Sequence, residues 1–146
     1  MMRSNKILES LHMIVGNEFV TTDRFATFAY SKDTSVFGGT DAGTVVRPGS
    51  TEEVSKIMSL AYQHRIPVVV RGGGSSIYGQ PKGVPGSNLL LDMTRMNTIL
   101  DLNLADMTVT AQAGIIMGKL QHACNRERLF IFTPSAPVHT VSGGFP

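Results

Sequence analysis

A glycine-rich loop that follows directly on an apolar strand is the feature that most constrains how this chain can fold. Residues 67–70 read Pro-Val-Val-Val, and residues 71–76 read Arg-Gly-Gly-Gly-Ser-Ser. Consecutive glycines adopt backbone conformations that other residues avoid, so successive N–H groups can point into one concavity and bind an anion. With two serine hydroxyls and the cation of Arg71 beside them, the loop suits a diphosphate better than a single carboxylate. The alternative is an ordinary tight surface turn.

The residues before this loop predict a strand, a helix and a second strand. The β-branched run 44–47 ends at a Pro-Gly pair and is typical of a strand. Ser50 then caps a helix that runs to about His64, and Glu53 at its third position completes a reciprocal capping box. Residues 67–70 are short and β-branched enough to form a buried strand. We therefore expect a parallel crossover unit.

The rest of the chain predicts further helices and strands around that unit. Residues 7–15 carry apolar side chains at helical spacing. Residues 19–43 show no sustained hydrophobic periodicity. They are expected to form a connecting segment, with one helical turn near residues 25–30. A turn is expected around residues 94–97. Later segments have the composition of two strands and a helix: 88–92, 107–112 and 116–127. Together these elements predict the α+β class.

Charge and cysteine content exclude several classes of function. Lys and Arg total 13 against 11 Asp and Glu, and the net charge of +2 is spread along the chain, so no basic surface for nucleic acid is expected. Cys124 is the only cysteine, which excludes an internal disulfide and a thiolate zinc cluster. We expect a cytoplasmic protein without a metal site. No apolar run approaches the roughly 20 residues that cross a bilayer, so no direct membrane span is expected.

Two familiar phosphate-binding loops are excluded by the spacing around the glycines. A Walker loop ends in Gly-Lys-Ser or Gly-Lys-Thr, and a Rossmann fingerprint opens a helix whose amino end holds the pyrophosphate. Here residues 77–86 hold several prolines and glycines, which forbid an early helix. A dinucleotide site in this chain is therefore expected to be built from loops.

Four blocks of residues, in order along the chain, resemble one known family. They are residues 46–54, 66–76, 89–97 and 109–114. In these blocks the chain is similar to the flavin-adenine-dinucleotide (FAD) binding domain of the vanillyl-alcohol oxidase superfamily, called the p-cresol methylhydroxylase (PCMH) type. Within the superfamily it resembles the branch of glycolate oxidase and D-lactate dehydrogenase flavoprotein subunits. The resemblance implies a PCMH-like domain: a small first subdomain that contains the β-α-β unit, and the start of a second subdomain.

The resemblance assigns FAD contacts to two segments. The glycine loop would wrap the pyrophosphate, and a later Gly-Gly turn, preceded by a turn that lacks the family's glycine, would contact the flavin from the other side. With Arg71 added from its charge, the expected contacts are Arg71, Gly72, Gly73, Gly74, Ser75, Ser76, Gly79, Gln80, Pro134, Ser135, Thr140, Ser142, Gly143 and Gly144. Some members of the family bind FAD covalently through a loop histidine. Ser75 stands at that position here, so non-covalent FAD is expected.

The resemblance also implies a function and a domain organisation. The chain is expected to be the FAD-binding portion of an oxidoreductase that acts on a 2-hydroxy acid or a similar CH–OH substrate. Residues 1–43 would form an N-terminal helical and connecting segment, and residues 44–146 an FAD-binding domain that is incomplete at its carboxyl end. Because family members continue with further strands and a substrate domain, catalytic residues are not assigned. A second chain that completes the domain, or an electron-accepting subunit, is an expected partner besides FAD.

Two alternatives to this function stay open. One is a truncated or split-gene remnant without activity of its own, and the other is a module that binds a different phosphate-bearing ligand. Other reactive side chains favour structural roles: His139 is a lone loop histidine, Asp92 and Arg95 suit a local ion pair or a turn cap, and Cys124 suits the buried face of a helix.

Overall fold

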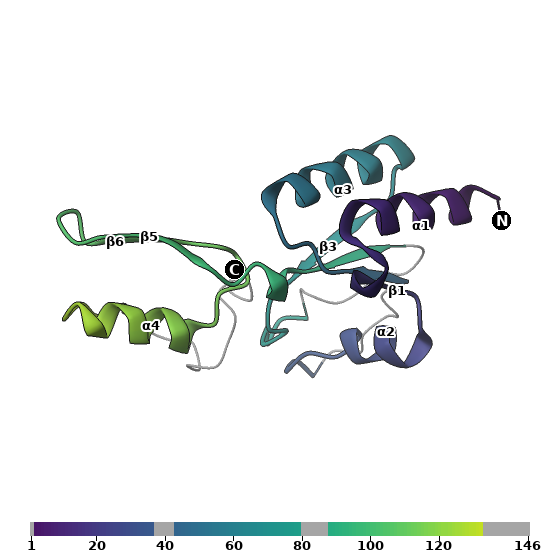
Figure 1. The fold of residues 1–146 in the computed structure, drawn as a ribbon. Coiled ribbons are helices and arrows are strands. Elements are labelled where there is room, and N and C mark those ends of the chain that lie inside the picture. The colour runs from purple at the N-terminus through teal and green to yellow at the C-terminus, as the bar shows by residue number, and fades with distance from the viewer. Residues whose placement is uncertain (1, 37–42, 80–87, 133–146) are drawn as a thin grey trace.

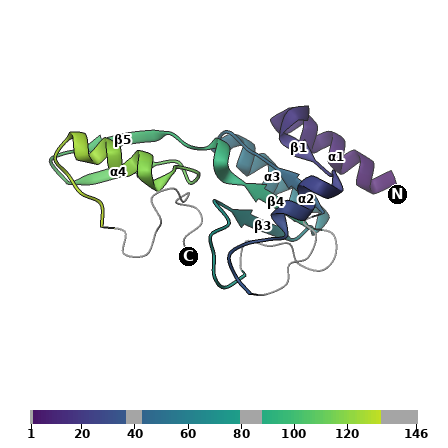
Figure 2. The ribbon, with the colours of Figure 1, turned by 90° about the horizontal axis from the view of Figure 1, so that it is seen from below.

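The computed structural model describes residues 2–36, 43–79 and 88–132. Within these ranges the chain forms a four-stranded sheet covered by helices and, at one end, a two-stranded hairpin with one helix beside it (Figures 1 and 2). The helices are α1 (Met2–Val15), η1 (Asn17–Phe19), α2 (Arg24–Tyr30), α3 (Thr51–His64), η2 (Met93–Arg95) and α4 (Met117–Arg126), η1 and η2 being single 3-10 turns. The strands are β1 (Val20–Thr21), β2 (Thr44–Val46), β3 (Val68–Arg71), β4 (Leu89–Asp92), β5 (Ile99–Asn103) and β6 (Thr108–Ala111).

Three strands of the larger sheet are parallel, and β4 lies at its centre. The strand order is β1-β2-β4-β3, with β1 antiparallel to β2 and the other neighbours parallel. The parallel relation of β2 and β3 is confirmed, although β4 pairs with both strands and separates them. The prediction that residues 67–70 form a buried strand is wrong, because β4 takes the central place. β3 is an edge strand, and its Val70 is 53% exposed.

Helix α3 begins and ends as its sequence indicates, with one difference at the cap. Ser50 Oγ accepts a hydrogen bond from the Glu53 N–H at 3.2 Å. Glu53 Oε2 accepts from the N–H of Gly49, at 2.7 Å, where the capping box predicts that of Ser50. After His64 the helix stops, because Arg65 takes a left-handed conformation with φ of 54°.

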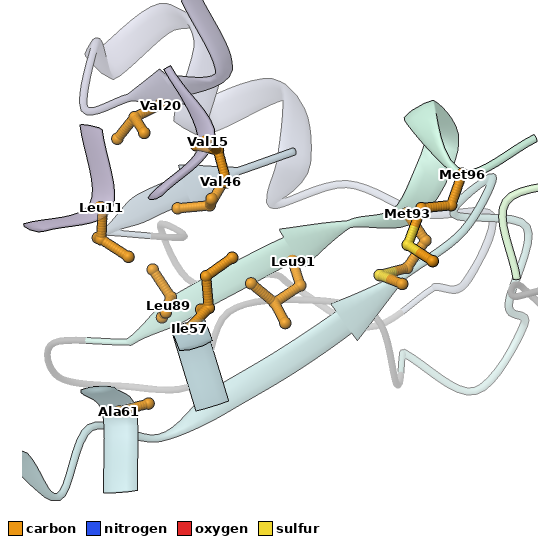
Figure 3. Packing of buried hydrophobic residues seen from close by; sticks show 10 residues of the cluster. All are labelled: Leu11, Val15, Val20, Val46, Ile57, Ala61, Leu89, Leu91, Met93 and Met96. Atoms are coloured by element: carbon orange, nitrogen blue, oxygen red, sulfur yellow. The ribbon is translucent and has the colours of Figure 1, made fainter. Parts of the chain in front are cut away.

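Strand β4 supplies side chains to both faces of the sheet. Successive side chains of a strand alternate, so Leu89 and Leu91 join the larger core while Leu90 packs with Val45 and Tyr30 on the other face. Helices α1 and α3 cover the larger core and α2 lies across the opposite face (Figure 1). Figure 3 shows the buried residues that meet in the larger core: Leu11, Val15, Val20, Val46, Ile57, Ala61, Leu89, Leu91, Met93 and Met96.

The segment before residue 37 is more regular than its sequence predicts. Helix α2 matches the expected helical turn, and the Asp23 carboxylate caps it by accepting the N–H groups of Phe25 and Ala26. Strand β1 falls in the part expected to be a plain connection, and it pairs Val20 with Val46. A two-residue strand is too short to show the alternation of apolar and polar residues by which a strand is predicted. Through α1 and β1 these residues share the core of the sheet.

The hairpin unit follows β4 through η2. The turn expected near residues 94–97 is this η2, which Asp92 caps by accepting the Thr94 N–H at 2.9 Å. Strand β5 is absent from the sequence prediction, because polar residues interrupt its alternation and a bulge shifts its register against β6. Helix α4 lies beside the hairpin and buries Leu120 and Cys124, as its spacing predicts (Figures 1 and 2). Ile116, expected on the same face, precedes the helix and is 42% exposed.

Truncating the core where α3 meets β4 is expected to destabilise the fold. Ile57 is 0% exposed, so Ile57→Ala should lower the free energy of unfolding by about 2–5 kcal/mol. The adjacent Met58 is 44% exposed, and Met58→Ala is the matched control, with an expected change within about 0.5 kcal/mol. Urea unfolding followed by circular dichroism measures both. Equal losses for the two variants would contradict the assigned core.

Candidate functional site

The glycine loop begins at the carboxyl edge of the parallel strands. Arg71, the last residue of β3, lies opposite Asp92, the last residue of β4. Ligands of open sheets of this kind bind outside the carboxyl ends of the strands. Gly72 and Gly74 are buried, whereas Gly73 is exposed. Gly74 has a φ of +68°, so this position requires glycine for its backbone conformation.

The Arg71 side chain turns back onto the segment that follows α2. Its Nη2 donates to the carbonyl of Lys32 at 2.9 Å, its Nη1 donates to that of Tyr30 at 3.3 Å, and the guanidinium lies 5.4 Å from the centre of the Tyr30 ring. A Cβ at position 74 would overlap Nη2, so the guanidinium also packs under Gly74. Burial lowers the pKa of Arg71, and the nearby Asp92 opposes that shift.

Residues 30–35, which we call the strap, lie against the glycine loop. The single hydroxyl hydrogen of Thr34 is shared in a bifurcated bond between the carbonyl oxygens of Ser75 and Ser76, which lie 2.9 and 3.0 Å from Oγ1. Figures 1 and 2 both show the chain after α2 running beside the loop that follows β3. Within the strap, Asp33 Oδ1 accepts from the N–H and the hydroxyl of Ser35, which holds the strap in a tight turn.

A tyrosine and an aspartate join the strap to the centre of the sheet. Tyr30 Oη donates to Asp92 Oδ2 at 2.6 Å, a short bond to a buried carboxylate. Burial first, and then the Asp92 carboxylate, raise the pKa of Tyr30 to about 12. Tyr30 thus remains a neutral donor at physiological pH. Asp92 caps a turn, as expected. Arg95 forms its ion pair with Glu53, at 3.6 Å, rather than with the nearby Asp92.

The structure brings the first group of predicted contacts together and leaves the second group outside its described ranges. Residues 71–76 and Gly79 form one continuous loop, in which the buried Ser76 Oγ accepts the Tyr78 N–H at 3.1 Å. Outside the described residues lie the remaining predicted contacts: Gln80, Pro134, Ser135, Thr140, Ser142, Gly143 and Gly144, together with His139. The role of each residue in binding stays a prediction.

The described part of the loop fits a pyrophosphate by its chemistry. Between Gly72 and Ser76 no side chain is larger than a serine, so phosphate oxygens can approach the backbone N–H groups. Thr34 contacts the loop through the carbonyl oxygens of Ser75 and Ser76, so these two contacts do not use backbone N–H donors. Sequence reasoning missed Tyr30 and Thr34, because nothing in a single sequence marks contacts between residues that are 62 and 41 positions apart.

Other features of the described ranges lie apart from the loop. A hollow of about 470 Å³ opens at the amino ends of β2 and β4, where Thr44 and Leu89 line it with Ile7 and Leu11 of α1. In the residues that the structure describes, no three His, Cys, Asp or Glu side chains gather as a metal would require. No helix of those ranges combines the length and apolarity of a membrane span.

Solved structures show the class of fold. An alkyldihydroxyacetonephosphate synthase superposes with a TM-score of 0.85 at 22% identity, over 96% of this chain and 28% of the other. A p-cresol methylhydroxylase with substrate bound superposes with a TM-score of 0.73 at 20% identity, over 86% of this chain and 25% of the other. The fold is therefore the PCMH-type FAD-binding fold, as the sequence predicts.

Sequence comparison then shows the family. The model of the FAD binding domain matches residues 42–146, and the chain belongs to this family. The glycolate oxidase subunit GlcD of Bacillus subtilis is 28% identical over 145 residues, which is 97% of this chain and 30% of that protein. The mitochondrial D-lactate dehydrogenase [cytochrome] of Kluyveromyces lactis is 32% identical over 101 residues, 68% of this chain and 18% of that protein. The chain thus spans less than a third of either relative.

The Tyr30 hydroxyl gives the fold a testable dependence on pH. Tyr30→Phe removes the bond to Asp92 and should lower the free energy of unfolding by about 1–2 kcal/mol at pH 8. Since the tyrosine pKa is raised from 10.0 to about 12 on folding, this contribution is present below pH 10 and is lost as pH rises to 12. Urea unfolding at pH 8, 10 and 11 measures the difference in free energy of unfolding between the unchanged protein and Tyr30→Phe.

The difference in free energy of unfolding between the unchanged protein and Tyr30→Phe is expected to shrink above pH 10. Tyr62→Phe at pH 8 is the control, because Tyr62 is 87% exposed on α3. A difference that stays constant from pH 8 to pH 11 would contradict the assigned bond.

Proposed function

We propose that this chain is the FAD-binding portion of a flavin-dependent oxidoreductase that oxidises a 2-hydroxy acid or a similar CH–OH substrate. The observation that carries the proposal is the glycine loop at the carboxyl edge of the sheet, inside the stretch that matches the FAD-binding family. The names of two relatives support the substrate class, because glycolate and D-lactate are both 2-hydroxy acids. The fold itself does not identify the substrate, because its structural neighbours are named as enzymes of other reactions.

When bound, FAD would supply the redox chemistry as the hydride acceptor. The residues of this chain bind and orient it. Gly72 to Ser76 present N–H and hydroxyl donors to the pyrophosphate, and Arg71 adds positive charge next to them. Groups that act on the substrate belong, in this proposal, to other parts of the protein.

Non-covalent attachment of FAD is part of the proposal. The support is chemical, because the loop from Gly72 to Ser76 offers only glycines and serines. By the family resemblance, Ser75 takes the position where some members have a histidine. A serine hydroxyl is a weak nucleophile without an adjacent base, so no flavin bond is expected there.

A protein partner and a cytoplasmic location complete the proposal. Apolar side chains are exposed on and next to the hairpin unit, among them Leu100, Met107 and Phe130, at 61%, 77% and 75% exposure. Surfaces of this kind favour association, here with chain that completes the domain or with an electron-accepting subunit. The lone Cys124 is consistent with a reducing compartment.

Flavin retention and reduction test the proposal directly. Protein incubated with FAD and desalted should keep visible flavin bands, and acid precipitation should release the flavin into the supernatant. In the full-length protein, glycolate or D-lactate added without oxygen should bleach those bands, and matched carboxylic acids without the hydroxyl should leave them unchanged. A folded protein that keeps no flavin but binds ADP would favour the alternative phosphate-ligand module, and flavin that no substrate bleaches would favour an inactive remnant.

A pair of glycine variants should locate the flavin on the loop. Gly74→Ala and Gly16→Ala each place a side chain at positive φ, +68° and +94°, and each should cost about 1–3 kcal/mol of stability. Only Gly74 lies in the loop, where the new Cβ would also displace Arg71. We expect Gly74→Ala to weaken FAD binding at least about tenfold and Gly16→Ala to leave it within twofold, measured by titration of flavin fluorescence. Equal affinities would place the flavin elsewhere.

A further inference from the structure

We propose that Thr34 is a positioning residue for the cofactor, because its hydroxyl fixes the peptide groups that face the pyrophosphate. This inference rests on the proposed function, since it assigns a role in holding the same diphosphate. The strap lies outside the four blocks that carry the family resemblance and holds none of the predicted FAD contacts. It enters the site only through the tertiary structure.

The contact itself dictates the direction of two N–H groups. Thr34 Oγ1 lies 2.9 and 3.0 Å from the carbonyl oxygens of Ser75 and Ser76. These peptide bonds are trans, and in a trans peptide the N–H points opposite to the C=O of the same plane. Holding both carbonyls toward the strap therefore turns the N–H groups of Ser76 and Ile77 away from it. Two successive donors then face the same side, which is the arrangement that an anion requires.

The strap is held in place by hydrogen bonds to the ends of two strands, β4 and β3. Its first residue, Tyr30, is bonded to Asp92 at the end of β4, and its Lys32 carbonyl is bonded to Arg71 at the end of β3. The position of Thr34 is thus tied to the two strands from whose carboxyl edge the loop begins. A loop that is ordered before the ligand arrives loses less conformational entropy on binding, and so binds more tightly.

The Thr34 side chain is exposed and contacts the loop through its hydroxyl, so it can be changed without opening the core. Thr34→Val keeps the shape and removes the donor, whereas Thr34→Ser keeps the donor. Thr108→Val, at an exposed position of β6, repeats the same chemical change away from the loop. The comparison among these three variants isolates the hydroxyl.

Affinities for FAD, ADP and AMP should separate positioning from general damage. In calorimetric titrations of the full protein, Thr34→Val is expected to raise the Kd for FAD and for ADP about fivefold and that for AMP by less than twofold. Thr34→Ser and Thr108→Val should stay within twofold of the unchanged protein for all three ligands. The inference is overturned if Thr34→Val binds ADP as tightly as the unchanged protein, or if its affinity for AMP falls as much as its affinity for ADP.

Hydrogen exchange in the absence of ligand gives a second, independent readout. Thr34→Val should speed amide exchange of residues 72–77 at least fivefold while residues 89–92 of β4 keep their rate, and Thr34→Ser should restore the slow exchange. Unchanged exchange in the loop overturns the inference. If the unchanged protein binds neither FAD nor ADP, the proposed function fails, and this measurement still decides whether Thr34 orders the loop.

Discussion

The structure depends most on the burial of β4 between two parallel neighbours. All four of its residues are buried, and its three leucines supply apolar side chains to both faces of the sheet. A strand paired on both edges fixes the register of its neighbours, because a slip by one residue would turn each side chain to the wrong face. This register sets Arg71 opposite Asp92 and so determines where the glycine loop starts.

The ends of β3 and β4 organise a small polar network around the loop. Asp92 caps the turn that leads to the hairpin unit and also accepts the Tyr30 hydroxyl, so one carboxylate connects three segments. Arg71 is bonded to strap carbonyls, which makes it an anchor of the loop as well as a positive charge near it. Structure and electrostatics of the site therefore share the same side chains, and a change in one of them alters both.

Membership of an FAD-binding family explains why the proposed site has no assigned catalytic group. The chain corresponds to less than a third of the relatives and structural neighbours compared above. A flavin carries the hard chemistry itself, so the binding portion of such an enzyme needs donors, shape and charge rather than a nucleophile or a base. In the described ranges, the residues around the loop have that character: backbone donors, two hydroxyls and a guanidinium.

The sequence by itself determined the elements whose signals are local. The cap at Ser50, the positions of α3 and α4, the glycine run after β3 and the four family blocks all lie within short windows, and the structure and comparisons agree with them. The periodicity erred only at the margins of the two helix faces, where Met58 and Ile116 are exposed. Tertiary structure decided what depends on pairing across the chain. It placed β4 rather than β3 at the centre, added the short β1 and the bulged β5, and set Thr34 against the loop. The physical reason is range: capping and periodicity act over a few residues, whereas strand order and the bonds of Thr34 and Tyr30 exist only once distant segments have packed together.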